Sequence, residues 1–270
     1  MAARAIRSLA VSVVLAIGLA ACAGGNPNVT RSPEPSAPSR DVTSLVRLAD
    51  GLSSRGELSA AIALYQRAAA QSDDVSELIR LGRALSEFGA AAPASGAFRR
   101  ALAREPGHPD ALLGLGTTYL ALGETSKSIQ YLTQLVDQGD GTDPVRYAAL
   151  GAAFDMAGRH EQAVAIFASG LQALPGNLDL KSNLALSFAF QGRHVAAINL
   201  MFDVTDALEA GRSHYRNLVL VLALAGQDRD AVTNGLRFLG ERETQDVMAQ
   251  AASVRRLSTG ADRARAIGLS

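Results

Sequence analysis

Residues 143–177 read DPVRYAALGAAFDMAGRHEQAVAIFASGLQALPGN, and this stretch decides the fold. Its apolar residues recur at helical spacing on two short segments. The first stripe consists of Tyr147, Leu150, Gly151 and Phe154, and the second of Ala163, Ile166, Phe167 and Leu171. Gly158 separates them, because glycine accepts the left-handed conformation at a helix C-terminus, and Pro175 stops the second. A helix pair this short cannot bury its own apolar face, so it needs neighbours of the same kind.

Those neighbours are present as a repeat. The turn glycine recurs at intervals of 33 to 35 residues, as Gly56, Gly89, Gly123, Gly158, Gly192 and Gly226. A leucine stands eight residues before each of them, at Leu48, Leu81, Leu115, Leu150, Leu184 and Leu218. A small residue stands five after each, at Ala61, Ala94, Ser128, Ala163, Ala197 and Ala231. A helix-turn-helix period of this length predicts stacked helix pairs.

The repeats resemble the tetratricopeptide repeat (TPR) family from about Val42 to Glu243. The family's Leu-Gly pair stands at Leu81-Gly82, Leu115-Gly116 and Leu150-Gly151. Two departures are the absence of Trp and the degenerate last repeat, where Gly235 replaces a bulky residue. The resemblance implies an all-α fold, a right-handed superhelical α-solenoid of about six repeats over residues 42–243. We expect a C-terminal capping helix at 244–257, with Thr244 as its N-cap, and a frayed tail at 258–270.

The N-terminus resembles a bacterial lipoprotein signal. Arg4 and Arg7 precede an apolar run from Leu9 to Leu19, which predicts a signal peptide over residues 1–21. Leu19-Ala20-Ala21-Cys22 looks like a lipobox, which implies that Cys22 becomes the mature N-terminus and carries acyl chains. Residues 22–41 then form a Pro/Ser/Gly-rich tether. The resemblance, with Ala23 after the cysteine, implies an outer-membrane lipoprotein facing the periplasm of a Gram-negative cell envelope. The alternative is an ordinary secretory signal that ends near a cysteine.

Charge and motifs argue against several functions. The chain has 26 basic and 26 acidic residues, so it lacks the basic excess that a nucleic-acid partner requires. No phosphate loop, nucleophile elbow or zincin motif occurs, so we predict that the protein is not an enzyme and has no cofactor. His160 and His194 follow equivalent turns, but no cysteine joins them. We interpret them as exposed turn residues rather than as metal ligands.

A solenoid binds its partners on the concave face that its first helices line. In repeats four to six the predicted groove positions are apolar, namely Met156, Leu186, Phe190 and Leu220. They indicate an apolar or amphipathic protein segment as ligand. Asn183 and Asn217 occupy positions whose asparagines hold a ligand's backbone in related repeats. Two alternatives stay open: coverage of the groove by the cap helix or by a tighter superhelix, and hydrogen bonding of the asparagines within the solenoid.

A lipobox, a Pro-rich tether and a short array with a degenerate last repeat together resemble the TadD-type lipoproteins of the tight-adherence (Flp) pilus machinery. The carrying segments are LKSNLALSFAFQGRHVAAINLM, YRNLVLVLALAGQDRDAV and a closing helix that ends VRRLS. The resemblance implies a lipid-anchored protein that assists assembly or outer-membrane placement of the pilus secretin. Alternatives are a pilotin of another secretion system, a scaffold lipoprotein for peptidoglycan enzymes, and, from another class, an envelope enzyme.

Overall fold

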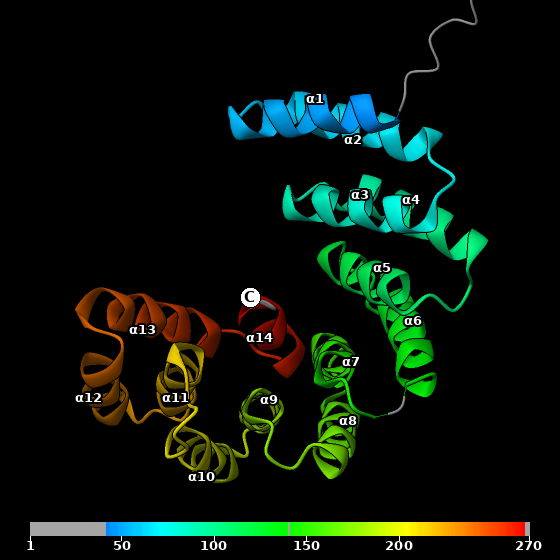
Figure 1. Cartoon of the computed structure of the whole chain (residues 1–270). Helices are drawn as coiled ribbons and strands as arrows, with labels where there is room; N and C mark the ends of the chain where they lie inside the picture. The colour runs from blue at the N-terminus through cyan, green and yellow to red at the C-terminus, as the bar shows by residue number, and fades with distance from the viewer. Residues whose placement is uncertain (1–41, 140, 268–270) are drawn as a thin grey trace, which may run out of the picture. The chain divides into compact units, whose positions relative to one another are not determined.

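The computed structural model describes residues 42–139 and 141–267. The predicted signal peptide (1–21), Cys22 and the tether (22–41) therefore lie outside the described residues. The described part contains fourteen helices and no strand (Figure 1). None of these helices has both the length and the apolar character needed to cross a membrane.

Six helix pairs follow one another, as the repeat predicts. The first helices of the pairs are α1 (Val42–Ser54), α3 (Val75–Glu87), α5 (Pro109–Ala121), α7 (Pro144–Met156), α9 (Leu178–Phe190) and α11 (Arg212–Leu224). The second helices are α2 (Leu58–Gln71), α4 (Ala91–Arg104), α6 (Thr125–Asp137), α8 (His160–Ala173), α10 (His194–Thr205) and α12 (Asp228–Phe238). Each helix packs on the next, and from α3 onward each first helix also contacts the first helix of the next pair. The predicted all-α solenoid is confirmed.

Glycine is needed at two positions of the repeat, for two different reasons. The six turn glycines all have positive φ, between 71° and 80°, as the predicted helix ends require. The glycine of the Leu-Gly pair instead permits a close approach. A Cβ on Gly82 would lie 2.8 Å from the ring of Phe98, and one on Gly116 would lie 2.5 Å from Cγ of Leu132. The bulky residue nine positions after the turn therefore packs directly on the backbone of the first helix.

The repeat leucines form the core except at the N-terminal end. Leu81, Leu115, Leu150 and Leu218 are buried, and Leu184 is partly buried. Leu48 is 53% exposed. It belongs to α1, the first helix of the described part, which packs on α2 and has no earlier helix pair there to cover its other face. The first repeat uses Leu45, Val46 and Ala49 instead.

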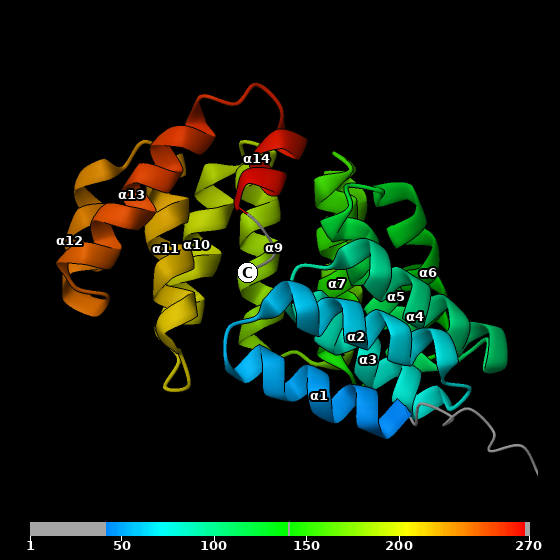
Figure 2. The same cartoon turned by 90° about the horizontal axis from the view of Figure 1, so that it is seen from above.

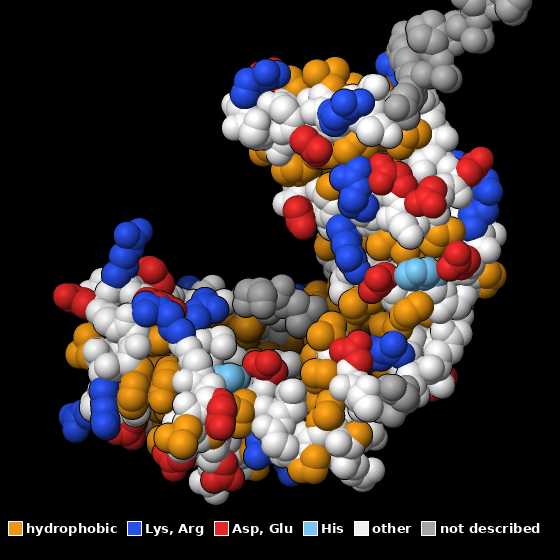
Figure 3. Space-filling model, viewed as in Figure 1, with side chains coloured by type: hydrophobic (Ala, Val, Ile, Leu, Met, Phe, Trp, Pro, Cys, Tyr) orange, Lys and Arg blue, Asp and Glu red, His pale blue; other side chains and the backbone are white. Residues whose placement is uncertain are grey.

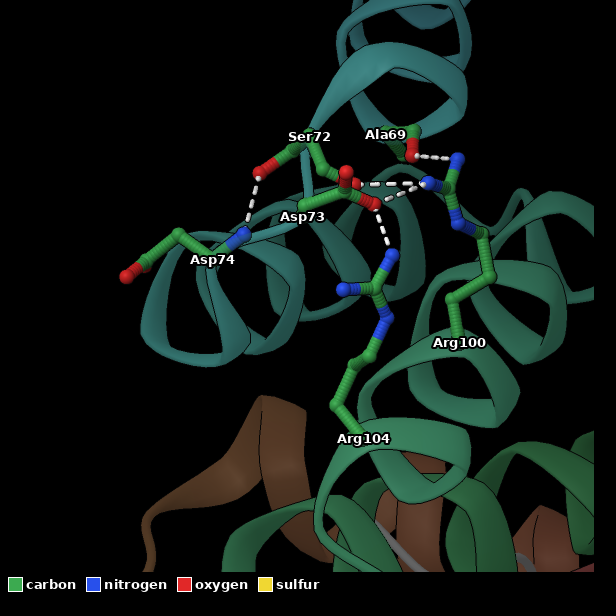
Figure 4. A network of polar contacts seen from close by, with 6 residues as sticks. All are labelled: Ala69, Ser72, Asp73, Asp74, Arg100 and Arg104. Atoms are coloured by element: carbon green, nitrogen blue, oxygen red, sulfur yellow. Dashed lines mark hydrogen bonds and ion pairs between the residues drawn. The ribbon is translucent and has the colours of Figure 1, made fainter.

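A polar network reinforces the joint between the first two pairs (Figure 4). Arg100 of α4 donates from Nη1 to the carbonyl of Ala69 at 2.6 Å and from Nη2 to that of Ser72 at 2.7 Å. The end of α2 thus gains a cation where its carbonyl groups lack helical partners. Asp73 accepts from Arg100 at 3.3 Å and also pairs with Arg104.

The C-terminal end differs from the prediction in two ways. The closing helix α13 runs from Glu241 to Arg255 and begins after Gly240, so Thr244 is not its cap. Thr244 lies inside α13 and packs over Gly235, where a Cβ would stand 2.5 Å from its Cγ2. The side chain of Thr244 therefore fills the space that the missing bulky residue leaves in the last repeat.

The predicted frayed tail is wrong for residues 260–267. Gly260 to Ile267 form a further helix, α14. A regular array would place it behind α13 as a second helix, yet it contacts α7, α9 and α13 (Figures 1 and 2). The chain thus turns back onto the face that the first helices line.

Candidate functional site

The inner face of α3, α5, α7 and α9 forms a groove of about 500 Å³, which we call the open groove. Its lining includes Arg83, Asp110, Leu113, Val145, Ala148 and Asn183. Arg83 pairs with Asp110 at 3.0 Å across α3 and α5. Hydrophobic side chains alternate with acidic and basic ones on the surface over α5 and α7 (Figure 3). This mixture suits an amphipathic protein segment rather than a small charged ligand.

The floor of the open groove is set by local sequence. Asp143 accepts a hydrogen bond from the Val145 amide at 3.0 Å, so α7 begins at Pro144 and presents Val145 at its first turn. Val145 remains 51% exposed, which leaves an apolar anchor facing solvent. Gly114 of α5 lies over the ring of Phe98, where a Cβ would be 2.8 Å from Cδ1. The Phe98 ring can thus pack directly against the α5 backbone at the groove, which Gly114 and Phe98 both line. The sequence predicted the groove in repeats four to six, and of the six residues named above only Asn183 lines this region.

The predicted groove of repeats four to six is also present but is occupied. It forms a cavity of about 110 Å³ between α7, α9 and α11 on one side and α14 on the other, which we call the closed groove. Five of the six predicted residues line it, namely Met156, Asn183, Leu186, Phe190 and Asn217. Ala264 and Ile267 of α14 line its other side. The covering element is therefore α14, and neither the capping helix α13 nor a tighter superhelix.

Leu220 does not belong to the groove. It is 2% exposed and joins the core cluster that contains Val247 and Ala251 of α13. Leu220 stands six residues before its turn glycine, as Leu186 does in the preceding repeat. Because α13 packs on α11 as the next first helix would, it covers this position.

The two asparagines play different parts. Asn217 donates from Nδ2 to Ser182 Oγ at 2.9 Å, which ties α11 to α9. It thus follows the alternative in which the asparagine bonds within the solenoid. Asn183 borders both grooves, and within the described residues its side chain has no hydrogen-bond partner. Asn183 is therefore the amide that can hold a ligand's backbone.

A buried polar cluster that the sequence did not predict lies beside the closed groove. Asp155 of α7 lies 2.7 Å from His160 Nδ1 of α8 and accepts from Ser187 Oγ of α9 at 2.9 Å. Burial raises the pKa of the Asp155 carboxyl, while the hydrogen bonds from His160 and Ser187 act in the opposite direction. His160 is largely buried, so its interpretation as an exposed turn residue is wrong.

This cluster is not arranged for nucleophilic catalysis. The Ser187 hydroxyl bonds to the carboxylate and not to the free imidazole nitrogen, so no base is placed to activate it. Among residues 42–139 and 141–267, no three His, Cys, Asp or Glu side chains converge as metal ligands. The three residues instead join three consecutive helices under the start of α14.

The comparisons agree with this geometry. Residues 45–174 match the family described as the middle TPR-like domain of cilia and flagella-associated protein 70. A tetratricopeptide repeat protein from Parabacteroides merdae superposes with a TM-score of 0.62 and 17% identity, covering 81% of this chain and 87% of that chain. PilW, described as a widely conserved type IV pilus biogenesis factor, gives 0.58 and 16%, covering 77% and 98%. Pseudomonas aeruginosa PilF gives 0.52 and 16%, covering 77% and 97%. No curated protein matches by sequence.

The chain therefore contains a TPR-like domain, and the solved structures that it resembles are TPR proteins. This fold is a protein-interaction scaffold and is typically not enzymatic.

Proposed function

We propose that the protein is a membrane-anchored TPR module that assists assembly or outer-membrane placement of a Flp/Tad-type pilus secretion machine. The observation that carries the proposal is the open groove, because its exposed Val145 and its Asn183 amide, unpaired among the described residues, suit an amphipathic segment of a protein. The partner is a protein, either the pilus secretin or another assembly component. Neither a nucleic acid nor a cofactor takes part.

The anchor is Cys22, the only cysteine in the chain. Several acyl chains on one residue hold a protein firmly at a membrane, whereas a single chain does so only marginally. The Pro-rich segment after Cys22 supplies reach. Confinement at the membrane raises the effective concentration of the partner, so a groove of modest affinity is sufficient.

The anchor is tested by cell fractionation and fatty-acid labelling of cells that express the full chain. Wild type should incorporate labelled palmitate and sediment with outer membranes. Cys22→Ser should do neither and should accumulate as a folded periplasmic protein. Ser36→Ala in the tether provides a control and should behave like wild type. Palmitate labelling of the Cys22→Ser chain would contradict this assignment.

The pilus role is tested by deleting the gene and measuring secretin multimers in the outer membrane. We expect fewer multimers and fewer surface pili, with recovery by wild type and poor recovery by Cys22→Ser. The similarity of fold to PilW supports a second candidate, an accessory lipoprotein of another envelope system. Normal Flp pili together with loss of a different envelope assembly would favour that candidate.

A further inference from the structure

The closed groove holds a helix that belongs to the same chain. The residues of α14 that face the solenoid are all small or aliphatic: Gly260, Ala261, Ala264 and Ile267. They recur at i, i+1, i+4 and i+7, which is the spacing of anchors when a helix lies in a groove. Between them Asp262, Arg263 and Arg265 pair among themselves or with the preceding turn. The helix α14 therefore has the form of a bound amphipathic peptide.

The contacts that attach α14 to the solenoid are weaker than those that attach α13. Ion pairs join α13 to the repeats, from Arg212 to Glu243 and from Arg255 to Asp228 at 3.0 Å. Within the described residues, one hydrogen bond joins α14 to the rest of the solenoid, from Gln250 Nε2 to the Ile267 carbonyl at 3.3 Å. Apart from Ile267, the rest of the contact is made by small side chains, which bury little apolar area. The structure thus fixes α13 and leaves α14 lightly attached.

The fit beneath α14 is also incomplete. A cavity of about 110 Å³ remains between α14 and the groove, and it is faced by Asn183, whose amide has no hydrogen-bond partner in the part of the chain that the structure describes. Unfilled space forfeits the contacts that a well-packed helix would make. A helix with a larger aliphatic side chain at the position of Ala264 would fill more of this space. The groove therefore has room for a better ligand than the one that it holds.

We propose that α14 is an exchangeable internal ligand that occupies the closed groove until a partner helix displaces it. The partner presents a short amphipathic helix with a small residue at the position of Gly260, a small or medium apolar residue four positions later and an aliphatic residue seven positions later. This inference rests on the proposed role of the array as an interaction module, and it adds the regulation of that module: only the open groove is accessible before α14 leaves.

One glycine allows the proposal to be tested in the intact chain. A Cβ on Gly260 would overlap Nε2 of His160 and would lie 2.9 Å from the carbonyl oxygen of Phe190. The Phe190 oxygen is backbone and cannot rotate away. Gly260→Leu therefore excludes α14 from the groove, while leucine favours the helix itself over glycine. Gly96→Leu is the matched control, because Gly96 lies within α4 and a Cβ there meets nothing within 4 Å.

The probe is a fluorescent peptide with the sequence of residues 258–270, STGADRARAIGLS, added to each mature full-length chain. Because its own glycine is unchanged, this peptide can enter a groove that α14 has left. An occupied site lowers apparent affinity by the fraction that is free, so we expect Gly260→Leu to bind the peptide at least about tenfold more tightly than wild type. Gly96→Leu should match wild type, and a peptide carrying Gly260→Leu should not bind.

Hydrogen exchange of the same chains gives a second readout. In Gly260→Leu the amides of α14 should lose protection while those of α7 and α9 keep theirs. If Gly260→Leu impairs folding, Ala264→Asp serves in its place, because it puts a carboxylate on the buried side of α14. Equal peptide binding by wild type and a folded undocked variant, or unchanged protection of α14, would overturn the proposal. The assay contains no pilus component, so its failure is separate from failure of the proposed pilus role.

Discussion

Gly260 lies against the imidazole of His160 so closely that no other residue fits without a shift of the chain. His160 is held from its other side by the buried carboxylate of Asp155. The order is Asp155 on α7, His160 on α8 and then the start of α14, so a buried charge fixes the surface on which the C-terminal helix rests. The role of the cluster is to position His160 beneath α14. This role explains why Asp155 is present at a buried position that the repeat does not require to be polar.

The Asp155 cluster predicts opposite results for two substitutions. Asp155→Asn keeps an acceptor oxygen for His160 and Ser187 and removes a carboxylate that is costly to bury, so it should leave stability at pH 7 unchanged or raised. Asp155→Ala removes both hydrogen bonds and should lower the free energy of unfolding by about 1–3 kcal/mol. Urea unfolding measures both. A loss in Asp155→Asn as large as that in Asp155→Ala would show that the charge itself is needed.

The same carboxyl predicts a pH dependence. The pKa of Asp155 is raised above its ordinary 3.8 in the folded state, so the folded protein holds this proton more tightly than the unfolded chain does. Its contribution to stability is greatest below pH 3.8 and falls as pH rises through the folded-state pKa. Relative to Asp155→Asn, wild type should therefore lose stability as pH rises from about 4 toward neutral. Parallel unfolding profiles of the two chains would contradict the raised pKa.

A repeat leucine tests the register of the array. Leu150 is buried between helices, so Leu150→Ala should cost roughly 2–5 kcal/mol. Leu48 occupies the same repeat position but lies on the uncovered face of α1. Leu48→Ala should therefore change stability by less than about 1 kcal/mol. Thermal or urea unfolding of both chains gives the comparison, and similar losses at the two positions would mean that α1 is covered in solution.

The periodic part of the structure was predictable because the same physical requirement recurs in every repeat. The turn glycines and the Leu-Gly pairs each appear several times, so chance matches are averaged out. Features at the two ends of the array occur only once, so no repetition supports their prediction. Leu48 is exposed because no helix before α1 packs on it within the described residues, and Leu220 is buried because α13 lies on α11. The exposure of each leucine depends on which helices pack against it, and the sequence of the leucine's own helix does not contain that information.

The helix α14 and the Asp155 cluster were not predictable for a different reason. The stripe from Gly260 to Ile267 consists mainly of small residues, which give only a weak periodic signal. Its docking depends on His160 and Phe190, which lie at least 70 residues earlier in the chain. Asp155, His160 and Ser187 come from three helices and occur once as a set. Only the fold brings them together.

We expect Arg100, at the contact between the first two helix pairs, to stabilise the fold through its hydrogen bonds rather than through its net charge. Arg100 donates to two carbonyl groups at the end of α2, so Arg100→Ala should cost about 1–3 kcal/mol. Arg99→Ala removes the same charge from an exposed neighbour that makes no hydrogen bond within the described residues and should cost less than about 0.5 kcal/mol. Urea unfolding compares them, and equal effects would reduce the role of Arg100 to charge alone.

A substitution at an exposed residue of the open groove should weaken binding of the partner and leave the fold intact. Phe190, which the sequence predicts to line the groove, is a poor position for this test because it is 7% exposed and packs on His160. Val145 is the better position, since it is 51% exposed and lines the open groove. Binding of an apolar segment over Val145 would bury the introduced carboxylate without a partner, which costs about 2 kcal/mol or more, so Val145→Glu should weaken capture of the partner by about tenfold or more.

The control for Val145→Glu is Val195→Glu. Val195 is 75% exposed on α10, a second helix, and lines none of the grooves described above. Both variants add one acidic side chain at an exposed valine, so net charge and solubility change equally. Co-purification of the secretin with each lipidated full-length chain, alongside circular dichroism, measures the difference. Loss of capture in Val145→Glu alone would assign binding to the open groove. Equal capture by both folded variants would move the binding surface away from α7, and equal loss would attribute the effect to charge rather than to the groove.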